Sequence, residues 1–424
     1  MRIKELHLTN IGPFNDAHLE FAADDKPRVT IITGENGTGK TIVLDAIRGL
    51  FGYHYVQLER KIHRNNQAFK ASMLISHSDA KKDGLFTQEK QEVIEALELG
   101  YNNDFQSNSF KTGGYEGIAH LPSGMASNQS EPQNWIVEYW RSNAVFEPFT
   151  IGTYKAPNLK TYLQGSLQGI HKNTETTELI CYFDVLRDSR DPKEKVIGEI
   201  VFRALEKIVK ASLVDGGKLK FVRRAELMPI IEQNGMEVPL SNLSSGNLYM
   251  IQRLVSLLGK MYAVHILRQT PPETLCDTPG LLLIDEAENH LHPKWQKRFI
   301  PTILEIFPNL QIIATTHSPF IVSSVEGAKV YVCKPHTDHC TIEDETDFYA
   351  NKPVEEVLAS PVFGTSPFGE EISKLLEERK KAINENNEQE RTRIEERLKE
   401  ENPQYFAYFD IDKRLEALLE GAEQ

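Results

Sequence analysis

Residues 34–41 constrain the fold of this chain more than any other stretch. They read G-E-N-G-T-G-K-T, which fits the pattern G-x-x-x-x-G-K-T of a phosphate-binding loop. Residues 28–33 before them form a β-branched run of strand length, and residues 42–47 after them have apolar side chains at helical spacing. The loop therefore lies between a buried strand and a helix N-terminus, where backbone N–H groups and the helix dipole can hold phosphate oxygens.

The two residues that end this loop have side chains suited to nucleotide chemistry. Lys40 is expected to bridge the β- and γ-phosphates, and the Thr41 hydroxyl is expected to hold Mg²⁺. A glycine-rich turn can match the pattern by chance, but the strand and the helix on either side argue against that interpretation. The nucleotide contacts are predicted at Asn36, Gly37, Thr38, Gly39, Lys40 and Thr41.

The bulk composition is that of an ordinary globular protein. The 424 residues can supply the cores of two or three domains. A net charge of −13 argues against a protein that coats nucleic acid with its whole surface, although it allows a local basic patch. The first residues alternate like a strand rather than a signal peptide, and no apolar run reaches transmembrane length. The cysteines are too few and too scattered for a disulfide framework, so we expect a cytoplasmic protein. They are Cys181, Cys276, Cys333 and Cys340.

Strands that alternate with helices predict an α/β fold with a mostly parallel sheet. The apolar run 281–284 ends in Asp285-Glu286, and the buried run 310–316 ends at His317. Because ligands bind at the carboxyl ends of parallel strands, these acidic and histidine side chains are expected beside the phosphate-binding loop. Short strands are predicted at 3–8, 17–21, 29–33 and 219–222, and helices within 160–214.

Three other segments have less regular patterns. Residues 100–134, rich in Asn, Ser and Gly, predict a long loop. The basic stretch 53–70 fits either a solvated helix face or a patch for nucleic acid or a partner. Residues 371–401 predict one long exposed helix with a thin apolar stripe. The aromatic cluster 405–409 that follows fits either a docking surface or a cap that folds back on the parent domain.

Four motifs now stand in a fixed order: the loop 34–41, Leu-Ser-Ser-Gly at 243–246, Asp285-Glu286 and His317. This order resembles the ATP-binding head of the ABC ATPase superfamily. The stretches 285–293 and 315–319 resemble the branch with SMC-like and OLD-type ATPases, and the chain is most similar to PtuA-type ATPases of Septu and retron-associated anti-phage systems. The resemblance implies a P-loop head with an antiparallel β subdomain, a helical lobe and a C-terminal helical tail.

The resemblance also implies boundaries and roles. The N-terminal lobe would span 1–150, the helical lobe 151–270, the Walker B part 271–350 and the tail 351–424. Asp285 would hold Mg²⁺ with Thr41, Glu286 would be the general base for ATP hydrolysis, and His317 would contact the γ-phosphate. Ser245 and Gly246 would meet the nucleotide bound by another subunit. Asn247 departs from the Glu or Gln that related signatures often have.

Some features keep more than one interpretation. The Q-loop glutamine has four candidates: Gln57, Gln88, Gln91 and Gln133. Arg141 is either a nucleotide contact or an ordinary surface arginine. The Cys and His residues of 333–340 have metal-ligand types, but their compressed spacing favours a hairpin tip. The pair Asp410 and Asp412 lies too near the C-terminus for a Toprim nuclease domain.

The resemblance implies a sensor ATPase that gates a small HNH nuclease supplied by another chain. It also implies a dimeric ATP sandwich, expected within a larger even-numbered assembly, and direct DNA contact stays open. One alternative is a DNA-repair ATPase of SMC or RecF type, although the chain lacks long heptad arms. A second alternative is the ATPase of a PARIS-type system, which has a Toprim partner. A third is a scaffold that hydrolyses ATP very slowly.

Overall fold

The computed structural model describes residues 1–22, 27–51, 69–78, 82–83, 86–87, 92–101, 109–112, 134–142, 149–164, 166–167, 169, 172–213, 216–349, 351–364, 368–385 and 387–409. The chain divides into two compact units, Met1–Val357 and Leu358–Gln424. The four candidate Q-loop glutamines, nearly all of the basic stretch 53–70 and the acidic pair at 410–412 lie outside the described residues. None of the described helices is long and apolar enough to cross a membrane.

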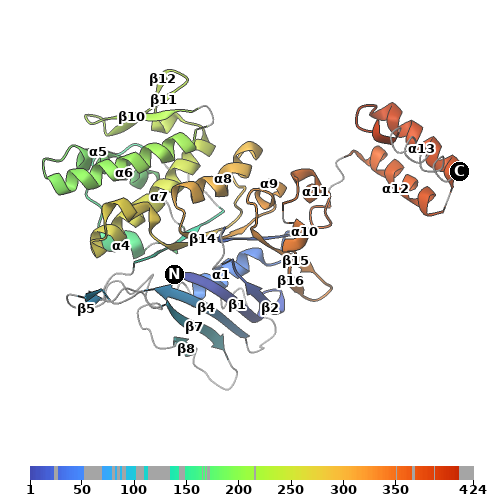
Figure 1. The fold of residues 1–424 in the computed structure, drawn as a ribbon, viewed down its shortest axis with the longest axis horizontal. Coiled ribbons are helices and arrows are strands. Elements are labelled where there is room, and N and C mark those ends of the chain that lie inside the picture. The colour runs from blue at the N-terminus through green and yellow to red at the C-terminus, as the bar shows by residue number, and fades with distance from the viewer. Residues whose placement is uncertain are drawn as a thin grey trace. The chain divides into compact units, whose positions relative to one another are not determined.

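One sheet of eleven strands runs through the first unit, in the order β8-β7-β4-β1-β2-β16-β15-β3-β14-β13-β9 (Figure 1). Its strands are β1 (Arg2–Ile11), β2 (Phe14–Glu20), β3 (Val29–Gly34), β4 (Phe69–Ser78), β7 (Glu92–Tyr101), β8 (Ser109–Thr112), β9 (Ile136–Trp140), β13 (Gly280–Ile284), β14 (Leu310–Thr315), β15 (Lys329–Pro335) and β16 (Cys340–Asp344). Two short strands, β5 (Lys82–Asp83) and β6 (Phe86–Thr87), pair apart from it.

The centre of this sheet is parallel. Strands β15, β3, β14, β13 and β9, in that order, pair in parallel with one another. Every residue of β3, β9, β13 and β14 is buried, which explains why these strands are mostly apolar. In the register, Ala314 of β14 lies opposite Ile31 of β3 on one side and Ile284 of β13 on the other. The carboxyl ends of the three strands therefore meet at one edge, and the predicted mostly parallel core is confirmed.

The remaining strands form the predicted antiparallel part. Strands β2, β1, β4, β7 and β8 pair antiparallel in turn, and β1 alternates buried and outward side chains along much of its length. The Gln311 side chain of β14 accepts from the backbone N–H of Ile3 at 2.7 Å and donates to its carbonyl at 2.8 Å. The sheet therefore curls back on itself around helix α1 (Lys40–Leu50), whose apolar face fills the space between. The loop predicted over 100–134 is wrong in part, because β8 lies within it.

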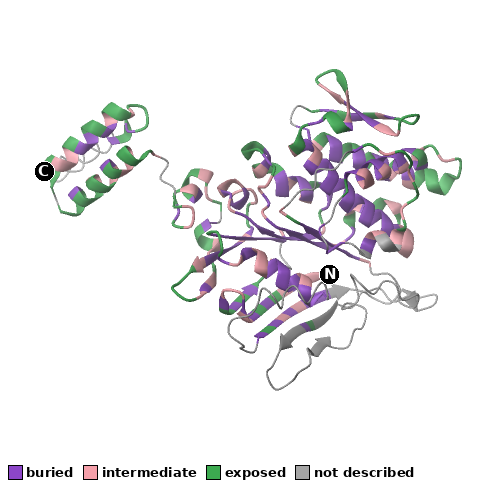
Figure 2. Cartoon of the chain, turned by 180° about the vertical axis from the view of Figure 1, so that it is seen from behind, coloured by how far each residue is buried: buried purple, intermediate pink, exposed green. Residues whose placement is uncertain are grey.

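The helical lobe follows β9 along the chain. It contains α4 (Leu159–Gln164), α5 (Asn173–Arg187), α6 (Pro192–Ala211) and α7 (Ser245–Arg268), and α7 is buried along most of its length (Figure 2). A three-stranded sheet covers α5 and α6: β10 (Lys218–Arg223), β11 (Met228–Gln233) and β12 (Met236–Pro239). The other elements are η1 (Leu240–Asn242), η2 (Pro272–Asp277), α8 (Pro293–Ile306), α9 (Pro319–Val322), α10 (Thr346–Tyr349) and α11 (Val354–Leu358).

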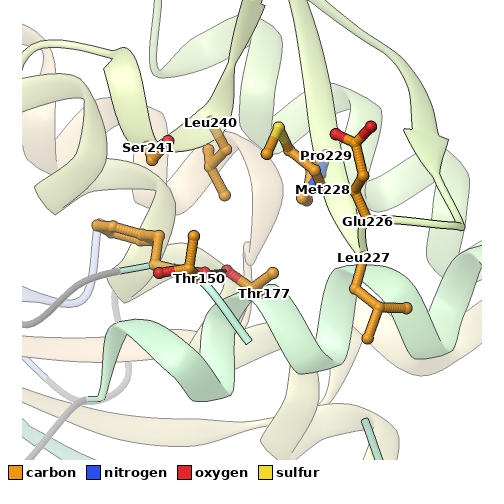
Figure 3. A pocket seen from close by; sticks show the side chains of 9 residues that line it. Thr150, Thr177, Glu226, Leu227, Met228, Pro229, Leu240 and Ser241 are labelled. Atoms are coloured by element: carbon orange, nitrogen blue, oxygen red, sulfur yellow. Dashed lines mark hydrogen bonds between the residues drawn. The ribbon is translucent and has the colours of Figure 1, made fainter. Parts of the chain in front are cut away.

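A small pocket lies where this three-stranded sheet meets α5 (Figure 3). Its walls are mostly apolar and include Phe149, Leu227, Met228 and Leu240. Thr177 points to it from α5, but its hydroxyl already donates to the carbonyl of Phe149 at 2.7 Å. A volume of about 20 Å³ leaves room for about one water molecule. The pocket is therefore too small to hold a nucleotide.

The second unit is a helical hairpin, so the single long helix predicted over 371–401 is wrong. Helix α12 (Glu370–Asn384) ends before residue 387, and α13 (Glu388–Glu401) begins there with Asn387 as its N-cap. Asparagine competes with the helical backbone for hydrogen bonds, which favours a break in an Asn-rich stretch. The Glu395 carboxylate, 1% exposed, accepts from Arg379 at 2.8 Å and Arg391 at 3.0 Å, and so fastens the two helices together.

The aromatic cluster contributes two side chains to the core of the second unit. Phe406 and Phe409 are fully buried among the apolar side chains of this hairpin: Leu375, Ala382, Ile394 and Leu398. Tyr405 and Tyr408 are exposed. Truncation of residues 404–424 would therefore remove part of the core of the second unit, and cannot test docking by itself.

We expect Phe406→Ala to unfold the second unit selectively. Removing a buried phenylalanine costs about 3–5 kcal/mol, and cores of units this small rarely supply more than about 3–5 kcal/mol. Hydrogen exchange should show loss of protection in α12 and α13, whereas protection in the first unit should remain. Tyr405→Ala, at a position 54% exposed, is the matched control and should leave protection unchanged. Intact protection in Phe406→Ala would contradict this account of the core.

Candidate active site

The phosphate-binding loop connects β3 with α1 at the carboxyl edge of the sheet. Glycine is needed at two of its positions. Gly39 has a φ of +97°, and a Cβ there would lie 2.6 Å from the side chain of Pro13. Gly37 has a φ of +81°, and a Cβ there would meet no atom within 4 Å. The backbone at Gly37 therefore faces open space without a side chain, which suits close approach of phosphate oxygens to N–H groups.

Lys40 lies beneath this loop and is 6% exposed. Its ammonium donates to two carbonyls of the same loop, Gly34 at 3.0 Å and Glu35 at 2.7 Å. Burial lowers the pKa of Lys40, and the acidic side chains of Glu288, Asp285 and Glu286 act in the opposite direction. A buried cation held by carbonyl dipoles is well suited to a polyanionic ligand.

Asp285 follows β13 and is 4% exposed. One of its carboxylate oxygens accepts from the Thr41 hydroxyl at 2.9 Å and from the Thr315 hydroxyl at 2.7 Å. Burial raises the pKa of Asp285, and these two hydrogen bonds oppose that rise. A hydroxyl and a carboxylate in contact are the oxygen ligands that Mg²⁺ takes beside nucleotide phosphates. The predicted pairing of Thr41 with Asp285 is therefore present in the structure.

Glu286 has the backbone strain often found at functional residues. Its φ is +51°, a left-handed conformation that is uncommon for a residue with a side chain. Its N–H donates to the Thr315 hydroxyl at 2.9 Å. Its carboxylate accepts from the Asn289 amide at 2.5 Å, and the same amide nitrogen donates to the Ser142 carbonyl at 3.3 Å. The backbone turn and the amide together fix where this carboxylate points.

His317 follows β14 and is held by the loop that follows β13. Its backbone N–H donates to one oxygen of Glu288 at 2.8 Å, and the Thr316 hydroxyl donates to the other at 2.6 Å. Burial, followed by the charge of Lys40, lowers the pKa of His317. The imidazole is therefore neutral at pH 7 and has one donor and one acceptor nitrogen.

The start of α7 contains the signature residues. Ser244 is the N-cap, and its hydroxyl accepts from the N–H of Asn247 at 3.4 Å. Ser245 is exposed, and a Cβ at Gly246 would lie 3.2 Å from the carbonyl of His290. Among the described residues, no hydrogen bond joins Ser245 or Gly246 to residues 34–41. The structure thus brings together the loop, Asp285, Glu286 and His317, and leaves the signature serine facing outward.

Two other predicted features have clear positions. Arg141 comes directly after β9, next to the end of β13, and is exposed. Its carbonyl accepts from Arg253 of α7 at 3.3 Å, and its nucleotide role stays a prediction. The hairpin at 333–340 is confirmed, because β15 pairs antiparallel with β16 across it. Cys333 is buried beside the loop 34–41, and burial raises the pKa of its thiol to about 12.

Several side chains that hold this site were not predicted from the sequence. Thr315 bridges Asp285 and Glu286, Glu288 binds the segment before His317, and Asn289 binds Glu286. Each is a polar residue within five positions of the end of a buried strand. Their positions near the ends of buried strands could have identified them as site residues, because the ends of neighbouring parallel strands lie together.

Two family models and several curated proteins are similar to this chain. The model of the family described as "AAA domain, putative AbiEii toxin, Type IV TA system" matches residues 72–323, and a second AAA domain model matches residues 1–93. "Retron Vc95 probable ATPase" of Vibrio cholerae serotype O1 biovar El Tor is 23% identical, over 89% of this chain and 82% of its own. "Septu protein PtuA" of Bacillus thuringiensis is 26% identical, over 78% of each chain.

Among solved structures, the SMC head domain from Thermotoga maritima is 14% identical with a TM-score of 0.45, and it covers 81% of this chain and 99% of its own. RecF of the RecFOR pathway has a TM-score of 0.40 at 14% identity, over 81% of this chain and 97% of its own. The relatives confirm the resemblance to PtuA-type and retron ATPases that the motifs indicated. The match over residues 72–323, more than half of the sequence, shows that this chain belongs to the AAA-domain family named above.

Proposed function

We propose that this chain is the ATP-binding and ATP-hydrolysing regulatory subunit of an anti-phage defence complex, and that it gates an HNH nuclease supplied by another chain. The observation that carries the ATPase part is the hydrogen bond between Thr41 and Asp285, beside buried Lys40. It joins the phosphate-binding loop to the acidic pair after β13. The defence part rests on the relatives named for Septu and retrons, and the nuclease part on the resemblance to PtuA-type ATPases.

The residues of the site fit ATP with Mg²⁺. Residues 36–41 would hold the phosphates through backbone N–H groups and Lys40, and Thr41 with Asp285 would hold the metal. Bound Mg²⁺-ATP supplies the phosphoanhydride bond, and its metal neutralises phosphate charge. Glu286, which the Asn289 amide holds, would orient a water and accept its proton, and His317 would donate to a phosphate oxygen from its neutral ring.

The proposal includes a shared site. Exposed Ser245 and half-buried Gly246 would complete the nucleotide site of a second copy, so the chain would act as a dimer or a larger even-numbered assembly. The proposed setting is the cytoplasm, as expected from the sequence. The four-part division of the chain and direct DNA contact remain proposals of the same kind.

The function is tested in cells that express this chain together with the genes that neighbour its own, among which we expect one for an HNH protein. Plaque numbers of a panel of phages should fall, and Lys40→Ala should restore them to the level of cells without the system. Purified wild-type protein should capture the HNH protein, and mixing the two should make nuclease activity depend on ATP. Protection that is indifferent to Lys40→Ala, or absent against every phage, would overturn the proposal.

A further inference from the structure

The two loops at the active-site edge are adjacent because their strands are parallel neighbours. Ile284 of β13 lies opposite Ala314 of β14, so residues 285–288 continue beside residues 315–317. The backbone N–H of Ala287 still donates to the carbonyl of Thr315 at 2.9 Å, beyond the end of β13. A side chain one position further along therefore reaches the segment that contains His317.

That side chain is Glu288, and both of its carboxylate oxygens are engaged. One accepts from the His317 backbone N–H at 2.8 Å, and the other accepts from the Thr316 hydroxyl at 2.6 Å. Glu286, two residues earlier, instead binds the amide of Asn289. The two glutamates thus differ in their contacts.

We propose that Glu288 is a positioning residue for His317. By binding the His317 N–H it fixes the main chain there, and so holds the imidazole toward the edge of the sheet where the nucleotide would bind. The inference rests on the proposed ATPase function and adds a residue to it. A carboxylate that binds the N–H of a residue limits the φ rotation of that residue. The direction of the His317 side chain therefore depends on both oxygens of Glu288.

The neighbouring contacts support this view of a fixed segment. Gln296 of α8 donates to the carbonyl of Leu291 at 2.8 Å and accepts from the Ser318 hydroxyl at 2.6 Å. Ser318 also donates its N–H to the Thr316 hydroxyl at 2.9 Å. The segment 316–318 is thus held at its start by Glu288 and at its end by α8. Without the Glu288 carboxylate, Thr316 and the His317 N–H would lose their hydrogen bonds, whereas Ser318 would stay bound to α8.

The test is a double-mutant cycle between Glu288 and His317. Glutamine keeps the shape of Glu288 but has one acceptor oxygen and places an NH₂ group against a donor. Glu288→Gln should lower kcat for ATP by up to about 100-fold through misplacement of the ring, with KM changed little. In a His317→Ala background, Glu288→Gln should change kcat by less than about two-fold, because the partner is already gone.

Asn289→Ala is the matched control, since it loosens Glu286 rather than His317. Its effect on kcat should persist in the His317→Ala background. Hydrogen exchange gives a readout that needs no turnover: the His317 amide should exchange roughly tenfold faster in Glu288→Gln and at the wild-type rate in Asn289→Ala.

The outcomes distinguish failure of the positioning role of Glu288 from failure of the proposed ATPase function. Multiplicative losses of Glu288→Gln and His317→Ala, or unchanged exchange of the His317 amide, would overturn the positioning role and leave the ATPase intact. Wild-type turnover no greater than that of Lys40→Ala would overturn the proposed function, and the exchange measurement would still decide whether Glu288 holds His317.

Discussion

Replacement of Glu286 by glutamine should lower ATP turnover by roughly 10²–10⁴, which is about 3–5 kcal/mol of activation barrier. Glutamine can still accept a hydrogen bond from Asn289, so the position of the side chain should survive. It cannot accept the proton of the attacking water at neutral pH. ATP binding should remain, because in the proposed function Lys40, Thr41 and Asp285 would hold the phosphates and the metal without it.

The measurement is the amount of unhydrolysed ATP that remains with the protein after gel filtration, together with phosphate release at saturating ATP. Glu286→Gln should retain ATP where the wild type retains ADP. Glu237→Gln removes an exposed carboxylate that pairs with Lys220 on the three-stranded sheet, and it should behave as wild type. Turnover of Glu286→Gln within a few-fold of wild type would show that another group is the base.

Motifs that depend on local backbone chemistry were predictable. The strand–loop–helix around residues 34–41 and the acidic pair after β13 are where their patterns placed them. A run of buried β-branched and aliphatic residues has few alternatives to a central parallel strand. Because such strands share one edge, the meeting of Thr41 with Asp285, 244 residues apart, followed from the fold class.

Features that depend on weak or competing signals were not predicted. The hairpin β11–β12 turns at Asn234-Gly235, both with positive φ, and Asn-Gly is a strong signal for such a turn. It was missed because the flanking strands have little apolar alternation. In the second unit, a charged stretch with one apolar stripe fits one long helix or two short ones equally well. The Asn-rich stretch 384–387 favours two helices, and the packing of Phe406 and Phe409 with both helices agrees with it.

The contacts that support the site could not be predicted from the sequence, for a different reason. Glu288 and Asn289 stand next to each other, yet they bind different partners, His317 and Glu286. Which partner each one reaches depends on the left-handed turns at Glu286 and His290, with φ of +51° and +64°. Non-glycine residues rarely adopt such angles, so the residue types at these positions do not predict them.

The strongest test of a shared site is complementation between two inactive variants. Ser245 is exposed at the first turn of α7, and among the described residues it has no hydrogen bond to residues 34–41 of its own chain. In a two-fold symmetric dimer, each site would combine one loop 34–41 with the Ser245 of the other copy. Ser245→Arg should abolish hydrolysis by blocking the partner's site, while nucleotide binding to its own loop survives. Lys40→Ala should abolish both.

Heterodimers of the two variants should regain activity. One of their two sites combines the intact loop of the Ser245→Arg copy with the intact Ser245 of the Lys40→Ala copy. With a different affinity tag on each variant and purification through both tags, turnover should reach about half of the wild-type value per dimer. Met236→Arg adds the same side chain at the exposed tip of the β11–β12 hairpin and should leave turnover unchanged. Doubly tagged heterodimers as inactive as their parents would show that Ser245 does not serve a neighbouring copy, because every other requirement of the site is met in them.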